Sequence, residues 1–224
     1  MLKRTLLTIS IVAIAFLLYG CKEKPAPQKP ADEKPAKTPV AEPAAKPDAK
    51  PALKPDTKEP EVTPPTLVKL TTTKGNITIE LFDDKSPITV KNFLAYVNSG
   101  FYDGTLFHRV IKNFMIQGGG LTPDMKRKPT QAPIKNETQN RVRNTRGTVA
   151  MARLKPLDSA TSQFFINHRD NSSLDFDGLY KGYAVFGKVV SGMEIVDRIA
   201  MVRTGMNDVP VEPIIITSAK VISE

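Results

Sequence analysis

The sequence is poor in the residues that form covalent cross-links and metal sites. Cys21 is the only cysteine in 224 residues, which excludes an intrachain disulfide and a zinc site built from several cysteines. The two histidines, His108 and His168, are far apart in the sequence, so no helical pair of metal ligands is available. We therefore expect no metal site.

A compact block of lysine and arginine, of the kind that binds phosphates, is also absent. The formal net charge is +9, but Lys3 and Arg4 lie in a predicted leader and the proline-rich segment that follows is nearly balanced in charge. The remainder is only moderately basic, which is typical of a solvated surface. We expect no nucleic-acid partner.

No apolar run is long enough for a comfortable membrane span, which needs about 20 residues. Residues 1–20 instead have the parts of an export signal: the charged Lys3 and Arg4, then an apolar run from Leu6 to Leu18. The run ends in Leu18-Tyr19-Gly20-Cys21, which resembles a bacterial lipobox. The resemblance implies a lipoprotein whose leader is removed and whose Cys21 is lipidated. An ordinary cleaved signal peptide with an incidental cysteine is the alternative.

Lipidation would place the protein in the cell envelope, anchored to a membrane on its periplasmic face. Stable anchoring takes more than one alkyl chain, a condition that the multiply acylated lipoprotein terminus meets. Lys22 follows the cysteine, and the absence of Asp there favours the outer membrane if the cell is Gram-negative.

Residues 21–65 comprise the lipidated cysteine and a linker of recurring Lys-Pro pairs among Ala, Asp and Glu, without aromatic residues. Such a segment buries too little apolar surface to offset its ordering entropy. We expect a disordered, extended tether, which at about 3.1 Å per residue reaches roughly 100 Å. A proline-rich ligand for another protein is the competing interpretation.

Residues 66–224 read as one folded domain of many short strands. Strands are expected at Leu67 to Leu70, Asn76 to Phe82, both halves of Phe107 to Gly119, Gly147 to Ala152, Ser162 to Asn167, Tyr183 to Val190 and Pro213 to Val221. The turn residues Lys74-Gly75-Asn76 predict a first hairpin. Many short strands with only two helices favour a mainly β fold, a closed antiparallel barrel capped at its ends.

Two helices are expected. Ser86-Pro87 opens the first, with Ser as N-cap and Pro at the first helical position, and Gly100 ends it. Its buried face is Val90, Phe93, Leu94 and Val97. Ser191 and Glu194 have capping-box spacing and open the second helix. Its inner face is Val196, Ile199 and Ala200.

The segment from Phe107 to Gly119 carries the first functional signal. It reads as two extended stretches with a bend at Lys112-Asn113. Strict alternation sorts the side chains of the first stretch into two faces: Phe107, Arg109 and Ile111 on one, His108 and Val110 on the other. In the second stretch, Met115 and Gln117 share a face, opposite Phe114 and Ile116. An arginine among apolar side chains, and a Met beside a Gln, are both consistent with a shallow pocket that is partly apolar and partly hydrogen-bonding.

The segment from Ser162 to Asn167 repeats this pattern. Gln163 and Phe165 point one way, whereas Phe164 and Ile166 point the other way and are assigned to the core. Gly118-Gly119-Gly120 lacks the Lys-Ser/Thr that follows a phosphate-binding loop, so we interpret it as a tight turn or a close backbone contact.

The blocks that carry a family resemblance are Phe107-His108-Arg109-Val110-Ile111, Phe114-Met115-Ile116-Gln117-Gly118-Gly119, Ser162-Gln163-Phe164-Phe165-Ile166-Asn167 and Phe186-Gly187-Lys188-Val189. They resemble the signature blocks of the cyclophilins, which are peptidyl-prolyl cis-trans isomerases. Asn144-Thr145-Arg146-Gly147 and Met151-Ala152-Arg153 resemble the bacterial periplasmic branch. The resemblance spans about Leu67 to Val221. It implies an eight-stranded barrel with two capping helices and no cofactor.

The resemblance also implies roles for individual residues. The catalytic arginine of the family falls on Arg109, with His108 beside it. The proline-pocket wall falls on Phe114, Met115, Phe165 and Leu174, hydrogen-bonding positions fall on Gln117 and Gln163, and the edge that pairs with the peptide backbone falls on Ala152 and Arg153. Tyr183 stands where animal members have histidine and keeps an aromatic wall. Ser173 replaces the tryptophan that binds cyclosporin, which implies weak inhibition by that drug.

These observations favour an exported, membrane-tethered prolyl isomerase that assists protein folding, acts on proline-containing polypeptides and is a monomer. A chaperone or adhesion module that binds proline-containing peptides without a need for turnover is the alternative, and a scaffold with a basic surface is a third. Arg109 has a simpler interpretation as a structural ion-pair partner. His108 is either a packed, hydrogen-bonded side chain or an acid or base, and Asp158-Ser159 with His168 forms no recognisable nucleophile triad.

Overall fold

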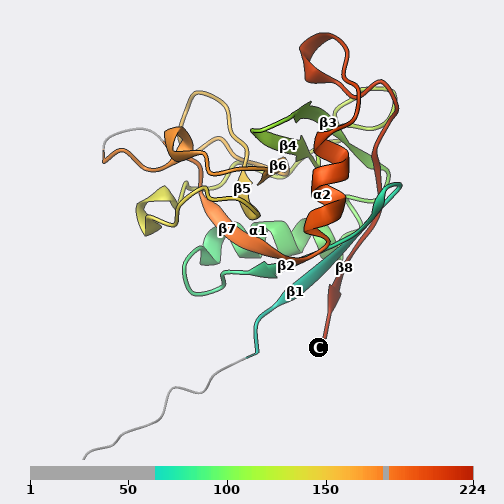
Figure 1. Cartoon of the computed structure of the whole chain (residues 1–224). Helices are drawn as coiled ribbons and strands as arrows, with labels where there is room; N and C mark the ends of the chain where they lie inside the picture. The colour runs from blue at the N-terminus through green and yellow to red at the C-terminus, as the bar shows by residue number, and fades with distance from the viewer. Residues whose placement is uncertain (1–63, 179–181, 224) are drawn as a thin grey trace, which may run out of the picture. The chain divides into compact units, whose positions relative to one another are not determined.

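The computed structural model describes residues 64–178 and 182–223 (Figure 1). The predicted leader, Cys21 and the tether up to residue 63 lie outside the described residues. Neither helix of the described part has the length and apolar character needed to cross a bilayer.

Eight antiparallel strands close into a barrel in the order β1-β2-β7-β5-β6-β4-β3-β8. The strands are β1 Leu67–Thr72, β2 Gly75–Leu81, β3 Thr105–Ile111, β4 Met115–Gly118, β5 Thr148–Met151, β6 Phe164–Asn167, β7 Val185–Ser191 and β8 Ile215–Ile222. The first hairpin pairs Thr72 with Gly75 across the predicted turn. Closure leaves no strand edge unpaired, and the predicted mainly β barrel is confirmed.

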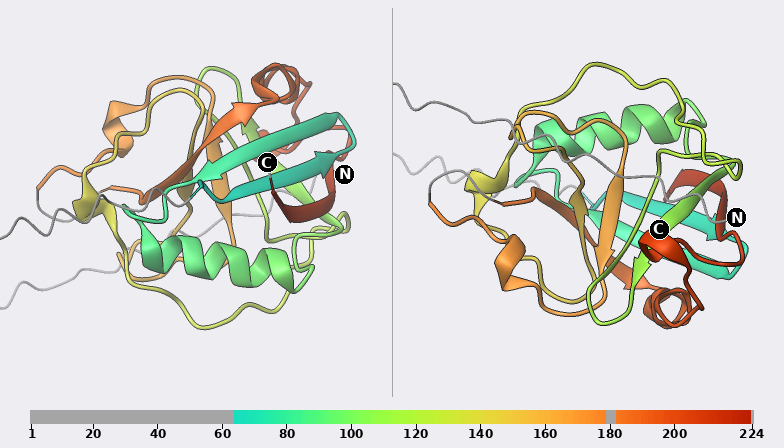
Figure 2. Two further views of the ribbon diagram at one scale, coloured as in Figure 1. Left: turned by 90° about the horizontal axis from the view of Figure 1, so that it is seen from below. Right: turned by 90° about the horizontal axis from the view of Figure 1, so that it is seen from above.

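The two helices, α1 Pro87–Asn98 and α2 Met193–Ala200, lie on opposite sides of the barrel (Figure 2). Each buries the apolar stripe predicted from its spacing: Val90, Phe93 and Val97 in α1, and Val196, Ile199 and Ala200 in α2. Three short 3-10 turns lie in the connections, at Thr138–Asn140, Ser172–Leu174 and Met206–Asp208.

The start of α1 is capped by a residue from a distant loop. Ser86 occupies the N-cap position, but its hydroxyl donates to the carbonyl of Val185 at 2.7 Å and makes no capping bond. The carboxylate of Glu137 instead accepts the backbone N–H of Ile88 at 3.1 Å and of Thr89 at 2.7 Å. The predicted N-cap position of Ser86 and the place of Pro87 are confirmed, but the Ser86 side chain does not cap the helix, because its buried hydroxyl is bonded to β7.

The predicted capping box of α2 was also wrong. The N-cap is Gly192, in the left-handed conformation with φ 89°, and no side chain caps the helix. A Cβ at this position would overlap the carbonyl oxygen of Asn76 on β2. The close approach of β2 therefore requires glycine here, and Ser191 remains the last, exposed residue of β7.

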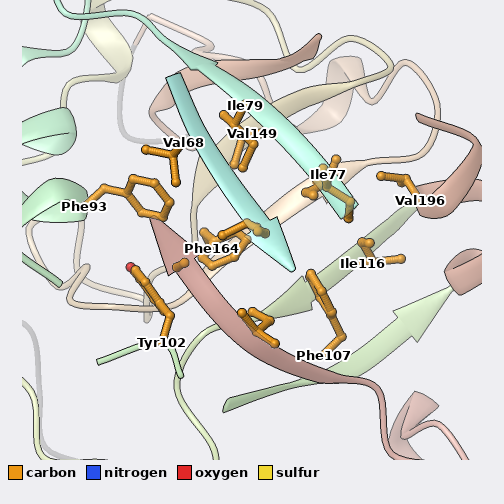
Figure 3. Packing of buried hydrophobic residues seen from close by; sticks show 14 of the residues in the cluster. Val68, Ile77, Ile79, Phe93, Tyr102, Phe107, Ile116, Val149, Phe164 and Val196 are labelled. Carbon is orange, nitrogen blue, oxygen red and sulfur yellow. The ribbon is translucent and has the colours of Figure 1, made fainter. Parts of the chain in front are cut away.

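The barrel interior is filled by aromatic and branched side chains (Figure 3). The rings of Phe93, Tyr102 and Phe164 pack against one another with centroids 5.2–5.6 Å apart. The hydroxyl of the buried Tyr102 donates to the carbonyl of Ser162 at 2.9 Å, so that no polar group of this ring is left unpaired in the core. Phe164 and Ile166 are fully buried there, as predicted.

A bulge at His108 changes the faces of β3. Phe107 pairs with Gly118 and Arg109 with Gln117, so β3 has one more residue than β4 over this interval. Phe107 and Val110 are consequently both buried in the barrel, whereas Arg109 is directed outwards. The predicted face shared by Phe107 and Arg109 was wrong, because an inserted residue breaks the two-residue alternation on which it depended.

The outer face of β4, β5 and β6 carries a second, smaller apolar cluster. Its buried members are Met115, Ala150, Phe165 and Val185. The outer cluster covers one face of β5 and β6, and the barrel interior covers the opposite face. Every residue of these two strands is therefore buried. The outward-facing side chains of β3 and β4 pack against this outer cluster.

We predict that Glu137→Ala destabilises the protein by about 1–2 kcal/mol, because the N–H groups of Ile88 and Thr89 lose their acceptor. Chemical denaturation monitored by circular dichroism would measure the loss. Glu137→Gln is the matched control: it keeps one acceptor oxygen and should lose less. Equal stability of Glu137→Ala and the wild type would contradict the capping role.

Candidate active site

A small cavity of about 160 Å³ opens on the outer cluster. Nine of the residues predicted for the site line it: Arg109, Phe114, Met115, Gln117, Ala152, Arg153, Phe165, Leu174 and Tyr183. Apolar cavities of about 150 Å³ hold one benzene ring, so a five-membered ring fits. The structure thus brings residues of five separate segments together, while their roles remain predictions.

The cavity walls are mainly apolar and aromatic. Met115 on β4 and Phe165 on β6 are almost fully buried, and the ring of Tyr183 packs edge-on against Phe165 at 5.5 Å. Phe114 lies in the turn before β4, outside the regular strand. It therefore lines the same cavity as Met115 and Gln117, although alternation placed it on the opposite face.

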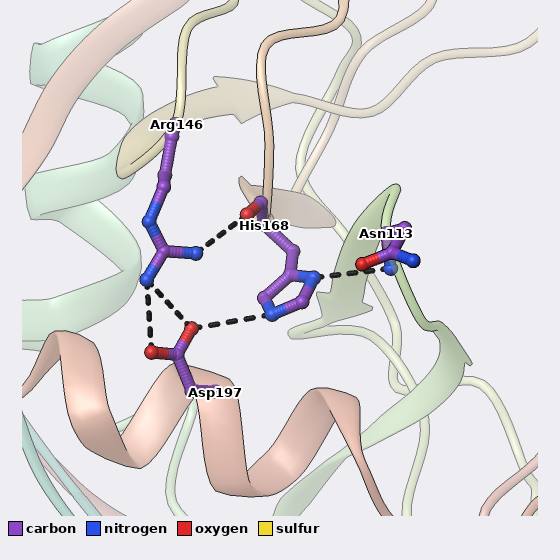
Figure 4. A network of polar contacts seen from close by, with 4 residues as sticks. All are labelled: Asn113, Arg146, His168 and Asp197. Atoms are coloured by element: carbon purple, nitrogen blue, oxygen red, sulfur yellow. Dashed lines mark hydrogen bonds and ion pairs between the residues drawn. The ribbon is translucent and has the colours of Figure 1, made fainter.

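The turn that carries Phe114 is held by the end of β6 and the residues that follow it. The carbonyl of Phe114 accepts the backbone N–H of His168 at 3.0 Å and the side-chain amide of Asn171 at 2.8 Å. Nδ1 of His168 accepts the backbone N–H of Asn113, while its Nε2 lies 3.2 Å from Asp197 of α2 (Figure 4). The structure assigns His168 to this support of the cavity wall, a role that its isolated place in the sequence did not indicate.

Arg109 is one of the two charged residues that line the cavity, and Arg153 is the other. The side chain of Arg109 is 42% exposed, and its Nε lies 3.4 Å from Oδ2 of Asp208. Among the residues that the structure describes, its two terminal nitrogens have no hydrogen-bond or ion-pair partner. A guanidinium is always protonated and donates only, so these N–H groups are free to donate to a ligand in the cavity.

The two predicted glutamines are hydrogen-bonded to each other. Nε2 of Gln117 donates to Oε1 of Gln163 at 3.0 Å. A Cβ on Gly120 would come within 2.5 Å of Cγ of Gln163, so the predicted close backbone contact of the glycine run is present. The second N–H of the Gln117 amide is available to a ligand.

Ala152 and Arg153 follow β5 and border the cavity. The N–H of Ala152 donates to the carbonyl of Gln163 at 2.9 Å, which removes it from the groups able to pair with a peptide. The Ala152 carbonyl and the Arg153 N–H have no partner among the described residues. The guanidinium of Arg153 stacks over the ring of Tyr183 at 4.8 Å and donates to the carbonyl of Gly182 at 3.0 Å.

A second cavity of about 570 Å³ adjoins the first. The two share Gln117, Ala152 and Arg153, and the second contains the remaining predicted residues, His108 and Gln163. Its lining adds further polar and charged side chains, among them Arg127, Thr130 and Ser159. An extended peptide that enters the small cavity therefore meets a larger one beside it.

His108 is neutral at physiological pH. Burial lowers its pKa from 6.5 to about 4, the charges of Arg109 and Arg127 act in the same direction, and the backbone hydrogen bond with Leu106 opposes them. Its buried Nδ1 has no partner in the described part of the chain. A neutral imidazole with so low a pKa cannot donate a proton near pH 7, which argues against a general acid. The burial agrees with a packed side chain, but the predicted hydrogen bond of Nδ1 is absent among the described residues.

Two residues that support the site, His168 and Asp208, were not predicted for it from the sequence. Asp208 contacts Arg109 although the two are distant in the chain, and no local motif marks it. No group of three His, Cys, Asp or Glu side chains within the described ranges is arranged to hold a metal ion. The lining of the smaller cavity suits binding of an apolar ring beside fixed hydrogen-bond donors.

Comparisons with known proteins give a consistent result. The family model of the cyclophilin type peptidyl-prolyl cis-trans isomerase/CLD matches residues 67–221. "Peptidyl-prolyl cis-trans isomerase A" of Dickeya dadantii is 57% identical over 163 residues, which are 71% of this chain and 86% of that protein. "Peptidyl-prolyl cis-trans isomerase B" of Escherichia coli is 54% identical over 162 residues, which are 69% of this chain and 99% of that protein.

A similar solved structure is that of a cyclophilin type peptidyl-prolyl cis-trans isomerase from Cryptosporidium parvum. It aligns with a TM-score of 0.64 at 30% identity and covers 71% of this chain and 98% of its own. A second structure of that protein, determined in the presence of the dipeptide Ala-Pro, aligns with a TM-score of 0.63 at the same identity, over 70% of this chain and 99% of its own.

We predict that neutral His108 makes stability depend on pH. The unfolded chain binds a proton near pH 6.5 and the folded chain only near pH 4, so acid favours unfolding. The contribution is complete above about pH 6.5 and is lost as the pH falls towards 4. Melting temperatures measured across this range should fall more steeply for the wild type than for His108→Gln. An NMR titration of the His108 ring with a midpoint near 6.5 would contradict this.

Proposed function

The chain belongs to the cyclophilin-type peptidyl-prolyl cis-trans isomerases, and we propose that it speeds rotation about X-Pro bonds through a hydrogen bond from Arg109 to the prolyl nitrogen. The observation that carries this mechanism is the guanidinium of Arg109 in the wall of an apolar cavity that has the size of one ring. The reaction breaks no covalent bond, so the enzyme has only to stabilise a twisted amide.

The barrier to rotation arises from the resonance of the amide. It amounts to about 18–20 kcal/mol, which makes the unaided reaction take tens of seconds. At the top of the barrier the amide is twisted, resonance is lost and a lone pair is localised on the prolyl nitrogen. The nitrogen can accept a hydrogen bond from Arg109 only in that state. An interaction made mainly in the transition state raises the rate, whereas one made equally in the ground state does not.

The apolar walls strengthen this interaction. With the ring seated against Phe114, Met115 and Phe165, water is excluded from one side of the guanidinium. Its field is then less screened than in bulk water, and donors that are already oriented need no rearrangement during the reaction. The stack of Arg153 on Tyr183 supports the wall that Tyr183 forms.

The polar border of the cavity holds the peptide on either side of the ring. The free N–H of the Gln117 amide is suited to a substrate carbonyl, and the Ala152 carbonyl with the Arg153 N–H is suited to the backbone of an extended segment. The side chain of a neighbouring substrate residue then enters the second cavity. No side chain changes its protonation state in this mechanism.

The biological role that we propose is assistance to the folding of exported proteins. Proline isomerisation is slow enough to limit folding, and proteins in the cell envelope fold after export. The predicted lipidation of Cys21 and the proline-rich tether would hold the isomerase domain at a membrane surface on the periplasmic side, free to reach emerging chains.

Cys21→Ser tests the proposed anchor. The wild type should fractionate with membranes, because two or more alkyl chains at about 0.8 kcal/mol per buried CH₂ hold it there. The variant should appear in the soluble envelope fraction or retain its leader. Cell fractionation with immunodetection measures this, and a wild type found entirely in the soluble fraction would refute the anchor.

Arg109→Ala tests the mechanism. In the full-length protein, kcat/KM for a prolyl peptide should fall by about 10²–10³, the loss expected when one transition-state donor is removed. Peptide affinity should change little, since the pocket walls remain. Arg169→Ala, which removes an exposed arginine that lines neither cavity, is the matched control and should keep full activity.

Two outcomes would contradict the mechanism. An Arg109→Ala variant with wild-type activity would show that the donor is dispensable. A variant with equal losses in affinity and activity would favour the alternative function, a chaperone or adhesion module in which Arg109 serves only to bind the peptide.

A further inference from the structure

The connection between α2 and β8 forms a closed loop that rises above β3 (Figure 1). Its base is fastened by backbone hydrogen bonds from Gly205 to Val209 at 2.8 Å and from Val211 to Arg203 at 3.0 Å. The tip is the 3-10 turn Met206–Asp208. These bonds fix the direction in which the tip projects.

Two consecutive residues at the tip have a backbone conformation that side chains disfavour. Asn207 and Asp208 have φ angles of 58° and 61°, in the left-handed region where residues other than glycine are uncommon. Asn and Asp tolerate this region better than other side chains do. Strained residues of this kind persist where the surrounding structure holds them and are concentrated at functional sites.

The strained turn directs a carboxylate to the arginine of the cavity. Oδ2 of Asp208 lies 3.4 Å from Nε of Arg109, with the two side chains 44% and 42% exposed. An ion pair this exposed contributes little to folding stability. We therefore expect the ion pair to affect the orientation of the guanidinium more than the stability of the fold.

We propose that Asp208 is a positioning residue for Arg109. A guanidinium is planar, with five N–H donors in a fixed geometry. A carboxylate on the Nε edge limits rotation of that plane and leaves the two terminal nitrogens for the cavity. Asp208 thus holds the guanidinium at Nε, and the two terminal nitrogens remain free to donate to the substrate. The inference rests on the proposed role of Arg109 in transition-state stabilisation.

Substrate binding strengthens this contact. The pair is half exposed in the free protein, so water and salt screen it. A peptide that covers the cavity removes water from one side of Arg109, and the attraction to Asp208 increases as the effective dielectric constant falls. The orienting effect is then greatest when the ring is bound.

Asp208→Asn in the full-length protein isolates the charge, because asparagine has the same size and the same tolerance of the left-handed region. We expect kcat for a prolyl peptide to fall about tenfold with KM nearly unchanged, less than the about hundredfold cost of a 1 Å misplacement. The melting temperature should stay within about 4 °C of the wild-type value. Asp208→Gly, which also relieves the backbone strain, should lose the same activity without losing stability.

Glu212→Gln is the matched control. It removes an exposed ion pair of equal length, 3.4 Å to Lys74, at the residue that follows the loop, and should leave kcat unchanged. A second readout does not depend on activity: the NMR signal of the Arg109 Nε–H. In the wild type this proton should exchange slowly with solvent, and in Asp208→Asn its exchange should become faster.

The outcomes distinguish this inference from the mechanism on which it rests. If Arg109→Ala loses activity while Asp208→Asn keeps both full kcat and slow Nε–H exchange, the positioning role is overturned and the mechanism stands. A loss in Asp208→Asn confined to KM would also overturn it, because the carboxylate would then act on peptide binding. If Arg109→Ala retains full activity, both proposals fail.

Discussion

The site depends on one irregularity, the extra residue at His108 in β3. Without the bulge, Phe107 and Arg109 would share a face, and the arginine could reach the outside of the barrel only if a phenylalanine left the core. With it, Phe107 and Val110 both fill the interior while Arg109 projects over the outer cluster. A core of interlocking rings tolerates few changes in volume. The outward position of Arg109 is therefore achieved by a bulge in the backbone and not by a change in core packing.

Two layers of support follow from this arrangement. The interior and the outer cluster bury both faces of β5 and β6. Phe165 on β6 and its neighbour Met115 on β4 are therefore buried walls of the cavity rather than exposed apolar side chains. Around the rim, polar contacts fix the parts that strands do not: His168 holds the turn of Phe114, and Asp208 contacts Arg109. Preorganised donors of this kind are effective because they need not rearrange during the reaction.

Sequence patterns predicted the regular parts well and the irregular parts poorly. Alternation sorted Phe164 from Phe165 correctly because β6 is unbroken, and helical spacing identified the buried faces of both helices. Alternation failed at Phe107 because a bulge leaves no mark in hydrophobic periodicity. Glu137 and Asp208 were missed as a cap and an ion-pair partner because each acts on a segment distant in sequence. Gly192 was missed as the N-cap of α2 because the close approach of β2, which requires glycine there, is a tertiary contact. Leu174 and Tyr183 were predicted for the candidate site only from the family resemblance, because positions outside helices and strands have no periodic pattern.

The central claim is that the terminal nitrogens of Arg109 face the nitrogen of a bound proline. The most direct measurement is a structure of the protein with a short X-Pro peptide in the cavity, of the kind that the Ala-Pro experiment on the Cryptosporidium parvum protein represents. The account predicts the ring against Phe114, Met115 and Phe165, with a guanidinium nitrogen near the prolyl nitrogen and Nε on Asp208. A ring bound elsewhere, or a guanidinium turned away from the prolyl nitrogen, would contradict it.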